Sequence, residues 1–259
     1  MSLLSHQHTY RPPPRDFKIH TFRHVHYLRA TRHPWPCLLF LLPLLAAYEI
    51  GIVWIGGTQA DALRSGADSW LHWAVEAFGL QQLYAIPLVI ALVFLVWSLL
   101  RLDDRPEDPT GVCLGMAIES LGFGLGLWAL SRTIGPLLDV LFGGLQMPPS
   151  GVDAATQIVT FVGAGIYEEL LFRLVLFSSL VALLRWLQAP RLVSLPVAAI
   201  LSALLFAAAH HAGPYGEPFD EYTFIFRAVA GLYFAVVFYS RGFGIAVGAH
   251  ALYDVLVGC

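Results

Sequence analysis

Apolar runs long enough to cross a bilayer occupy most of this chain and restrict what it can fold into. They cover residues 35–55, 83–100, 112–130, 155–184, 195–211, 222–240 and 243–257. A membrane-spanning helix takes about 20 residues, so each run is a candidate transmembrane helix. A further run, 134–145, is too short to span alone and has glycines near its end, which is typical of a half-membrane or surface helix. We therefore expect an all-α fold, a polytopic transmembrane helix bundle with seven or eight spans.

Composition supports an integral membrane protein and excludes nucleic acid as a partner. The chain is 57% hydrophobic and only 13% charged, whereas soluble domains are about 25% charged. Its net charge of -3 does not provide the excess of positive charge that nucleic-acid binding needs. Cys37, Cys113 and Cys259 stand singly in the sequence, without the spacing of a metal cage or a disulfide framework.

Charge along the first part of the chain predicts its orientation. Residues 1–33 form a polar arm with six lysines and arginines: Arg11, Arg15, Lys18, Arg23, Arg29 and Arg32. Positive residues beside the first span mark the inner side, so we expect a cytoplasmic N-terminus and a multi-pass protein of the plasma membrane. Residues 34–110 are expected to form the N-terminal spans. Within them, the mixture of charged and aromatic residues at 61–80 predicts an interfacial amphipathic helix.

Three charged residues lie inside one apolar run. Residues 163–177 read GAGIYEELLFRLVLF and contain Glu168, Glu169 and Arg173. Each such charge costs roughly 2.5–3.5 kcal/mol at the centre of a bilayer, so these residues usually face the protein interior and serve a function. On a helix, Glu169 and Arg173 lie about 40° apart and can form an ion pair, while Glu168 lies on another face. We expect Glu168 to meet a partner from elsewhere in the bundle.

Two later apolar runs offer such partners. FAAAHH at 206–211 contains His210, and GAHALYD at 248–254 contains His250 and Asp254, which share one helical face. Polar groups from three helices can meet in the core of a bundle. The set permits hydrolysis of a peptide or ester, in which Glu168 takes a proton from water and His210 helps to hold that water. His250 would then donate toward the developing oxyanion.

These motifs resemble those of the CAAX-protease and bacteriocin-processing family, also called the Abi family. EELLFR matches the EExxxR motif, FAAAH the FxxxH motif and HALYD the HxxxN/D motif. One motif alone is weak, but three in this order on apolar segments form a specific pattern. The resemblance implies that residues 111–259 form a catalytic membrane domain, and it does not extend to the N-terminal arm.

Members of that family are glutamic-type intramembrane endopeptidases, so the resemblance implies cleavage of a protein or peptide substrate, lipidated or not, beside membrane lipid. It implies no cofactor and no metal. Eukaryotic prenyl-protein members usually have Asn where this chain has Asp254, and an ionised Asp cannot donate a hydrogen bond. Orienting His250 is therefore the role expected of Asp254. The implied catalytic residues are Glu168, His210, His250 and Asp254, with Glu169 and Arg173 supporting them.

The same residues allow other interpretations. His211 can replace His210 as the participant. Glu168, His210 and His250 can ligate a metal, as His₂Glu sets do in zinc metalloendopeptidases, although the HExxH spacing is absent from the sequence. The cluster can also lock the helices of a non-enzymatic immunity or membrane-assembly scaffold. The sequence also lacks the GxSG and GxGD motifs of other intramembrane proteases.

Other charged residues in or near apolar runs match no motif. Glu49, Glu119 and Asp139 are expected to be supporting or interfacial groups. Arg227 is expected to anchor its span or to contact a substrate.

The expected orientation and the resemblance disagree about the side that the site faces. With a cytoplasmic N-terminus and seven spans, Arg185 and Arg191 are cytoplasmic and the His210 end of its run is on the other side. The resemblance implies a site open to the cytosol. An additional span near 134–145 would reconcile the two predictions.

Overall fold

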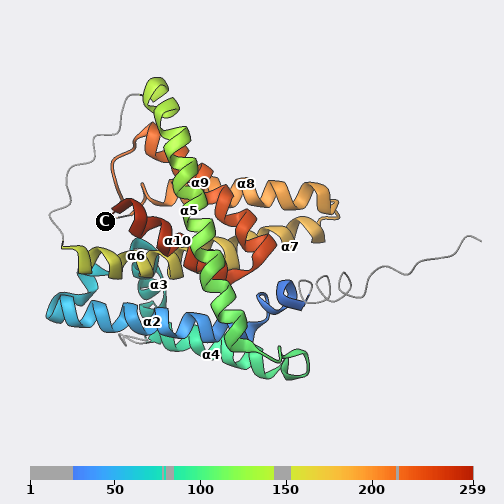
Figure 1. Cartoon of the computed structure of the whole chain (residues 1–259). Coiled ribbons are helices and arrows are strands. Elements are labelled where there is room, and N and C mark those ends of the chain that lie inside the picture. Colours follow the sequence, from blue (N-terminus) through green and yellow to red (C-terminus); the bar gives the residue numbers. More distant parts are fainter. Residues whose placement is uncertain (1–25, 78, 80–84, 143–152, 214–215, 259) are drawn as a thin grey trace, which may run out of the picture.

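The computed structural model describes residues 26–77, 79, 85–142, 153–213 and 216–258, and most of the predicted basic arm, residues 1–25, lies outside this part. The described residues are predominantly helical and contain no strand, so the predicted all-α fold is confirmed (Figure 1). The helices and helical turns are α2 (Pro34–Gly56), η1 (Gly57–Leu63), α3 (Gly66–Glu76), α4 (Ala85–Leu99), η2 (Leu102–Asp104), α5 (Pro109–Phe142), α6 (Ala154–Glu169), η3 (Leu170–Phe177), α7 (Ser178–Trp186), α8 (Arg191–Ala209), α9 (Glu221–Arg241) and α10 (Phe243–Gly258).

The helices have the length and apolarity of an integral membrane protein. Within the described residues, four stretches are long and apolar enough to cross a membrane: Pro34–Leu63, Pro109–Phe142, Arg191–Ala209 and Glu221–Arg241. Two shorter apolar helices, Ile86–Leu99 and Phe243–Gly258, accompany them. The predicted count of seven or eight spans is not confirmed.

Two helices differ from the predicted boundaries. The stretch 134–142, predicted as part of a separate short helix, is the end of the 34-residue helix α5, and residues 143–145 are not described. This prediction is wrong because Gly135 and Pro136 do not interrupt the helix. No separate span therefore begins at residue 134, and this reconciliation of the two orientation predictions is lost. The run 155–184 is helical throughout but is divided into α6, the π-helical segment η3 and α7.

α10 lies at the centre of the bundle. Every residue from Phe243 to Ala251 is buried, so this helix is covered on all sides along that stretch. It packs against α5 and α6, and α5 passes across it in Figure 1. At Gly165 a Cβ atom would lie 2.9 Å from the backbone nitrogen of Ala251, so only glycine permits this approach of α6 to α10. The small residue thereby brings the end of α6 next to the middle of α10.

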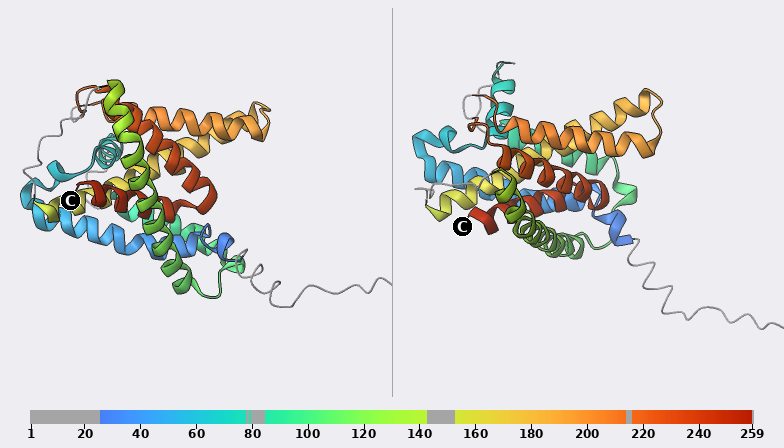
Figure 2. Two further views of the ribbon diagram at one scale, coloured as in Figure 1. Left: turned by 45° about the horizontal axis from the view of Figure 1, so that its top comes forward. Right: turned by 90° about the horizontal axis from the view of Figure 1, so that it is seen from above.

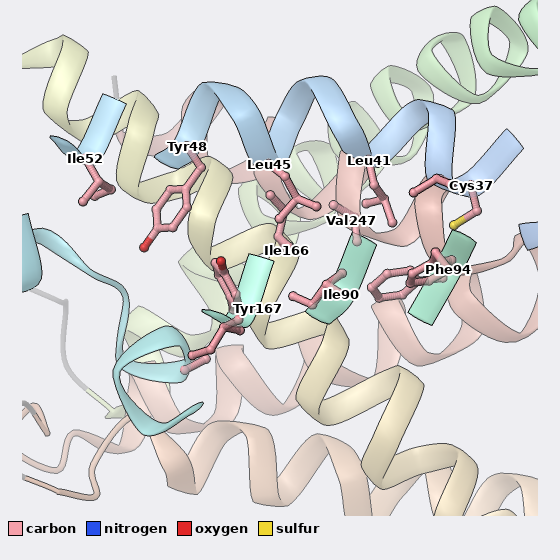
Figure 3. Packing of buried hydrophobic residues seen from close by; sticks show 14 of the residues in the cluster. Cys37, Leu41, Leu45, Tyr48, Ile52, Ile90, Phe94, Ile166, Tyr167 and Val247 are labelled. Atoms are coloured by element: carbon pink, nitrogen blue, oxygen red, sulfur yellow. The ribbon is translucent and has the colours of Figure 1, made fainter. Parts of the chain in front are cut away.

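The N-terminal half packs on the other side of α6. Leu41, Leu45, Ile90 and Phe94 from α2 and α4 form one core with Ile166 and Val247 (Figure 3). Tyr48 and Tyr167 lie in the same core with ring centroids 5.4 Å apart.

A buried ion network fixes α3 to α2. Arg64 pairs with Glu49 at 3.3 Å and with Asp68 at 2.7 Å, and the side chains of Arg64 and Asp68 are almost fully buried. Tyr48 donates a hydrogen bond to Asp68 at 2.7 Å, and Tyr167 donates one to Glu49 at 2.8 Å. The single helix predicted at 61–80 is shorter in the structure: α3 spans Gly66–Glu76, η1 ends at Leu63, and residues 78 and 80 are not described. Arg64 and Asp68 are buried in the protein rather than exposed on an interfacial face. Their mutual neutralisation makes this inward orientation possible.

We predict that Arg64→Met strongly destabilises the protein, because it removes the arginine that pairs with both buried carboxylates. Asp68 keeps its contact with His72 at 2.9 Å, but Glu49 loses its ion pair. Breaking a buried pair in this way costs about 3–5 kcal/mol. The midpoint of thermal unfolding in detergent measures the effect. Arg101→Met is the matched control, since Arg101 and Asp104 form an exposed pair that is worth about 0–1 kcal/mol. Equal midpoints for the two variants would contradict this view of the network.

Candidate active site

The structure brings together the four residues predicted to be catalytic. Glu168 lies near the end of α6, His210 caps the C-terminal end of α8, and His250 lies in α10. One carboxylate oxygen of Glu168, Oε2, lies 3.7 Å from Nε2 of His210 and 3.7 Å from Nε2 of His250. Asp254 Oδ2 lies 3.5 Å from Nε2 of His250. Both imidazoles thus face the same carboxylate. Glu168 meets partners from two other helical segments, as expected from the sequence.

The orientation of His210 follows from the end of α8. Its Nδ1 lies 2.9 Å from the carbonyl oxygen of Phe206, one helical turn earlier. A carbonyl oxygen only accepts, so Nδ1 carries the hydrogen, and Nε2 of the neutral ring is an acceptor directed at Glu168. The ring also packs edge-on against Phe206, with centroids 4.9 Å apart. The motif phenylalanine therefore positions the histidine through both its backbone and its ring.

His250 is held from two directions. Its Nδ1 donates a hydrogen bond to Glu169 Oε1 at 2.8 Å, which leaves Nε2 facing Glu168 and Asp254. The ring stacks on Phe234 of α9, with centroids 4.5 Å apart and planes 14° apart. Sequence reasoning missed the contact with Glu169 and expected Asp254 to orient this ring. The Asp254 contact, at 3.5 Å, is longer than an ordinary hydrogen bond.

Glu169 and Arg173 are the most deeply buried pair of the site, which we call its floor, and their predicted ion pair is confirmed. Arg173 Nη1 lies 3.1 Å from Glu169 Oε1, and the two side chains are at most 1% exposed. Arg173 also donates to the carbonyl oxygen of Gly231 at 3.2 Å. Its guanidinium carbon lies 4.4 Å from the centre of the Phe206 ring, which adds a cation–π contact. One arginine therefore connects α6, η3, α8 and α9 beneath the two histidines.

A π-helical segment begins directly after the two glutamates. η3 spans Leu170–Phe177 and contains Arg173. Such segments are rare and occur frequently at functional sites. The hydroxyl of Ser178 donates to the carbonyl oxygen of Arg173 at 3.2 Å, five residues back, which satisfies a carbonyl group in this widened turn. The sequence alone gave no sign of this change in helical pitch.

Exposure increases from the floor of the site toward one side. The Glu169 side chain is 0% exposed and that of His250 5%, whereas Glu168 is 12% exposed and His210 and Asp254 are each 22% exposed. The loop after α8 borders this open side, where Arg227 pairs with Glu217 at 2.9 Å. A molecule arriving at the site therefore meets Glu168, His210 and Asp254 first.

The remaining candidates are not members of this cluster, although Arg227 lies close enough to act electrostatically on Glu168, His210 and Asp254. His211 packs against Phe219 and Phe224, and its Nδ1 contacts the carbonyl oxygen of Glu217. Arg227 donates a hydrogen bond to Glu217 at 2.9 Å, and its predicted role as a span anchor or a substrate contact stays a prediction. Three carboxylates lie elsewhere: Glu49 in the α3 network, Glu119 in an ion pair with Arg241, and Asp139 on the exposed face of α5. Among the described residues, no group of three or more His, Cys, Asp and Glu side chains has the arrangement of a metal site.

Comparison with known proteins finds one family that matches the part of the chain containing this cluster. Residues 150–256 match the family described as "Type II CAAX prenyl endopeptidase Rce1-like". The resemblance to CAAX proteases is confirmed. The match includes every residue of the cluster and begins after the N-terminal helices, which end at residue 142. No curated protein and no solved structure matches the chain.

We predict that Arg173→Ala harms stability because it leaves the buried Glu169 carboxylate without its arginine. The expected cost is about 3–5 kcal/mol. Adding Glu169→Gln removes the stranded charge and should recover part of the loss, while Arg132→Ala on the exposed face of α5 should change little. Thermal unfolding in detergent compares the three variants. If the double variant is no more stable than Arg173→Ala, the ion pair is not the reason for the loss.

Proposed function

We propose that this protein is an intramembrane endopeptidase that hydrolyses a peptide bond with water activated by Glu168 and His210. The observation that carries the proposal is the convergence of the two histidine Nε2 atoms on Glu168 Oε2, each at 3.7 Å. This separation exceeds a direct hydrogen bond and leaves space for one water oxygen to contact both groups. The match of residues 150–256 to type II CAAX prenyl endopeptidases supports the same reaction class.

The first step uses the two most accessible groups. The hydrogen bond from His210 Nδ1 to Phe206 leaves Nε2 as an acceptor for one hydrogen of the water. Glu168 accepts the other proton as the water oxygen attacks the carbonyl carbon of the substrate. The carbonyl π bond breaks, and its electrons move to the oxygen. Glu168, now protonated, then delivers that proton to the leaving nitrogen as the peptide bond breaks.

In this proposal, His250 stabilises the oxyanion. Its Nδ1–H is committed to Glu169, so Nε2 is the atom directed to the substrate side. An imidazolium at this position donates from Nε2 to the oxygen on which charge develops. Glu169 and Arg173 are positioning residues in this proposal, because they contact His250 or each other and lie beneath the open side. Asp254 borders the same nitrogen and favours the imidazolium.

The substrate is proposed to be a protein or peptide that reaches the site from the membrane or its surface. The family description names prenyl endopeptidases, and a lipidated C-terminus is the substrate that we propose to test first. A plasma-membrane location, a cytoplasmic N-terminus and the division into 1–33, 34–110 and 111–259 remain parts of this proposal.

We predict that Glu168→Gln removes nearly all turnover without unfolding the protein. The amide has the same shape but cannot accept the proton of the water, and general-base assistance contributes about 10²–10⁴-fold. The assay measures the cleavage rate of an internally quenched farnesylated peptide in detergent micelles. The same peptide without the farnesyl group is assayed beside it. Glu107→Gln, at an exposed loop carboxylate, is the matched control and should retain full activity. His210→Ala should resemble Glu168→Gln.

Two outcomes of the same assay would contradict the proposal. If the parent cleaves neither peptide and Glu168→Gln lowers the midpoint of thermal unfolding, the cluster acts as a scaffold. If a chelator stops the parent and zinc restores it, Glu168, His210 and His250 are metal ligands rather than a water-activating set.

A further inference from the structure

A cavity lies at the end of the bundle where α7 turns into α8. Its volume is about 440 Å³, and its wall contains Phe177, Val181, Leu195 and Phe238, with Arg185 and Arg191 at the rim. We propose that this cavity binds an anionic phospholipid, with an acyl chain against the apolar wall and the phosphate on the two arginines. The proposal does not depend on the protease reaction.

The two arginines are the first reason. Arg185 donates to the carbonyl oxygen of Ala189 at 2.9 Å, and Arg191 donates to the hydroxyl of Tyr239 at 3.1 Å. In the described part of the chain, neither guanidinium forms an ion pair with a carboxylate, whereas Arg173 and Arg241 do. Both are exposed, and no acidic residue lines the cavity. Their positive charge and remaining N–H donors suit a phosphate group.

The position of the hairpin is the second reason. α7 and α8 extend side by side beyond the other helices (Figures 1 and 2). At the tip, Trp186 is 74% exposed and Leu192 is 90% exposed. Exposed tryptophan is typical of the membrane interface. The tip is therefore at headgroup level, and the cavity runs from the arginines toward the hydrocarbon.

The polarity of the cavity selects a phospholipid among possible occupants. Charge is confined to the rim and the wall is predominantly apolar, which matches an amphiphile with one anionic end. Free phosphate would leave the apolar wall unused. Basic pockets between transmembrane helices bind anionic headgroups by the same chemistry.

This cavity is separate from the candidate active site. Arg191 begins α8 and His210 follows its last residue, and α8 has 19 residues. At 1.5 Å per residue, the two ends are about 28 Å apart, close to the thickness of the hydrocarbon core. Variants at the rim therefore leave Glu168 and His210 undisturbed.

Native mass spectrometry of protein released from nanodiscs tests the proposal. The nanodiscs contain equal amounts of phosphatidylglycerol and phosphatidylcholine. We expect the parent to retain phosphatidylglycerol preferentially, and Arg185→Gln with Arg191→Gln to lower that preference about 25-fold, at about fivefold for each arginine. Arg132→Gln, at an exposed arginine on α5, should keep the preference of the parent. Equal preference in the parent and the double variant would overturn the proposal.

A second variant distinguishes lipid binding inside the cavity from binding of the headgroup by the two arginines alone. Val181→Trp fills the apolar wall and keeps both arginines, so it should also lose retained phosphatidylglycerol. Millimolar inorganic phosphate should not displace the lipid from the parent. If Val181→Trp retains the lipid as the parent does, or if inorganic phosphate displaces it, the arginines bind the headgroup without the cavity and the proposal fails. Near-equal thermal midpoints of all variants show that the comparison is between folded proteins.

Discussion

The carboxylate of Glu169 is shared between Arg173, which follows it in the same helical run, and His250 of α10. The ion pair measures 3.1 Å and the hydrogen bond 2.8 Å, both in a fully buried setting. A buried carboxylate without a partner would lower the stability of the fold by several kcal/mol, roughly 3–5. The stability of Glu169 in this position therefore depends on both Arg173 and His250. Through Arg173 the same group reaches Gly231 of α9 and the Phe206 ring of α8. The geometry of the accessible residues depends on this floor.

A second buried network supports α6 from the opposite side. Tyr167 precedes Glu168 and donates to Glu49, which pairs with Arg64 and thereby links α2 to α3. Adjacent residues on a helix point about 100° apart, so Tyr167, Glu168 and Glu169 face different neighbours. Tyr167 faces the N-terminal half, Glu168 the two histidines, and Glu169 the floor. The N-terminal helices lie outside the family match at 150–256, yet they fix the helix that carries Glu168.

The sequence predicted the parts of the site that depend on local spacing. A separation of four residues predicted the Glu169–Arg173 pair, and three polar intrusions in apolar runs predicted which helices meet. It did not predict that His250 binds Glu169 more closely than Asp254, because helical rotation alone does not show which carboxylate faces a given neighbour. The π-helical pitch of η3 and the continuation of α5 through Pro136 were also missed. Both depend on packing and on backbone hydrogen bonds that apolar periodicity does not encode.

The central claim is that Glu168 activates water and does not itself attack the substrate. A single turnover in H₂¹⁸O, followed by mass spectrometry of the product and of the enzyme peptide containing Glu168, tests it directly. Attack by activated water places ¹⁸O in the new product carboxylate and leaves Glu168 unlabelled. If Glu168 were instead a nucleophile, it would form an anhydride with the substrate acyl group. Hydrolysis of that anhydride at the glutamyl carbonyl would place ¹⁸O in Glu168 and leave the product carboxylate unlabelled. Label in Glu168 after one turnover would contradict the account.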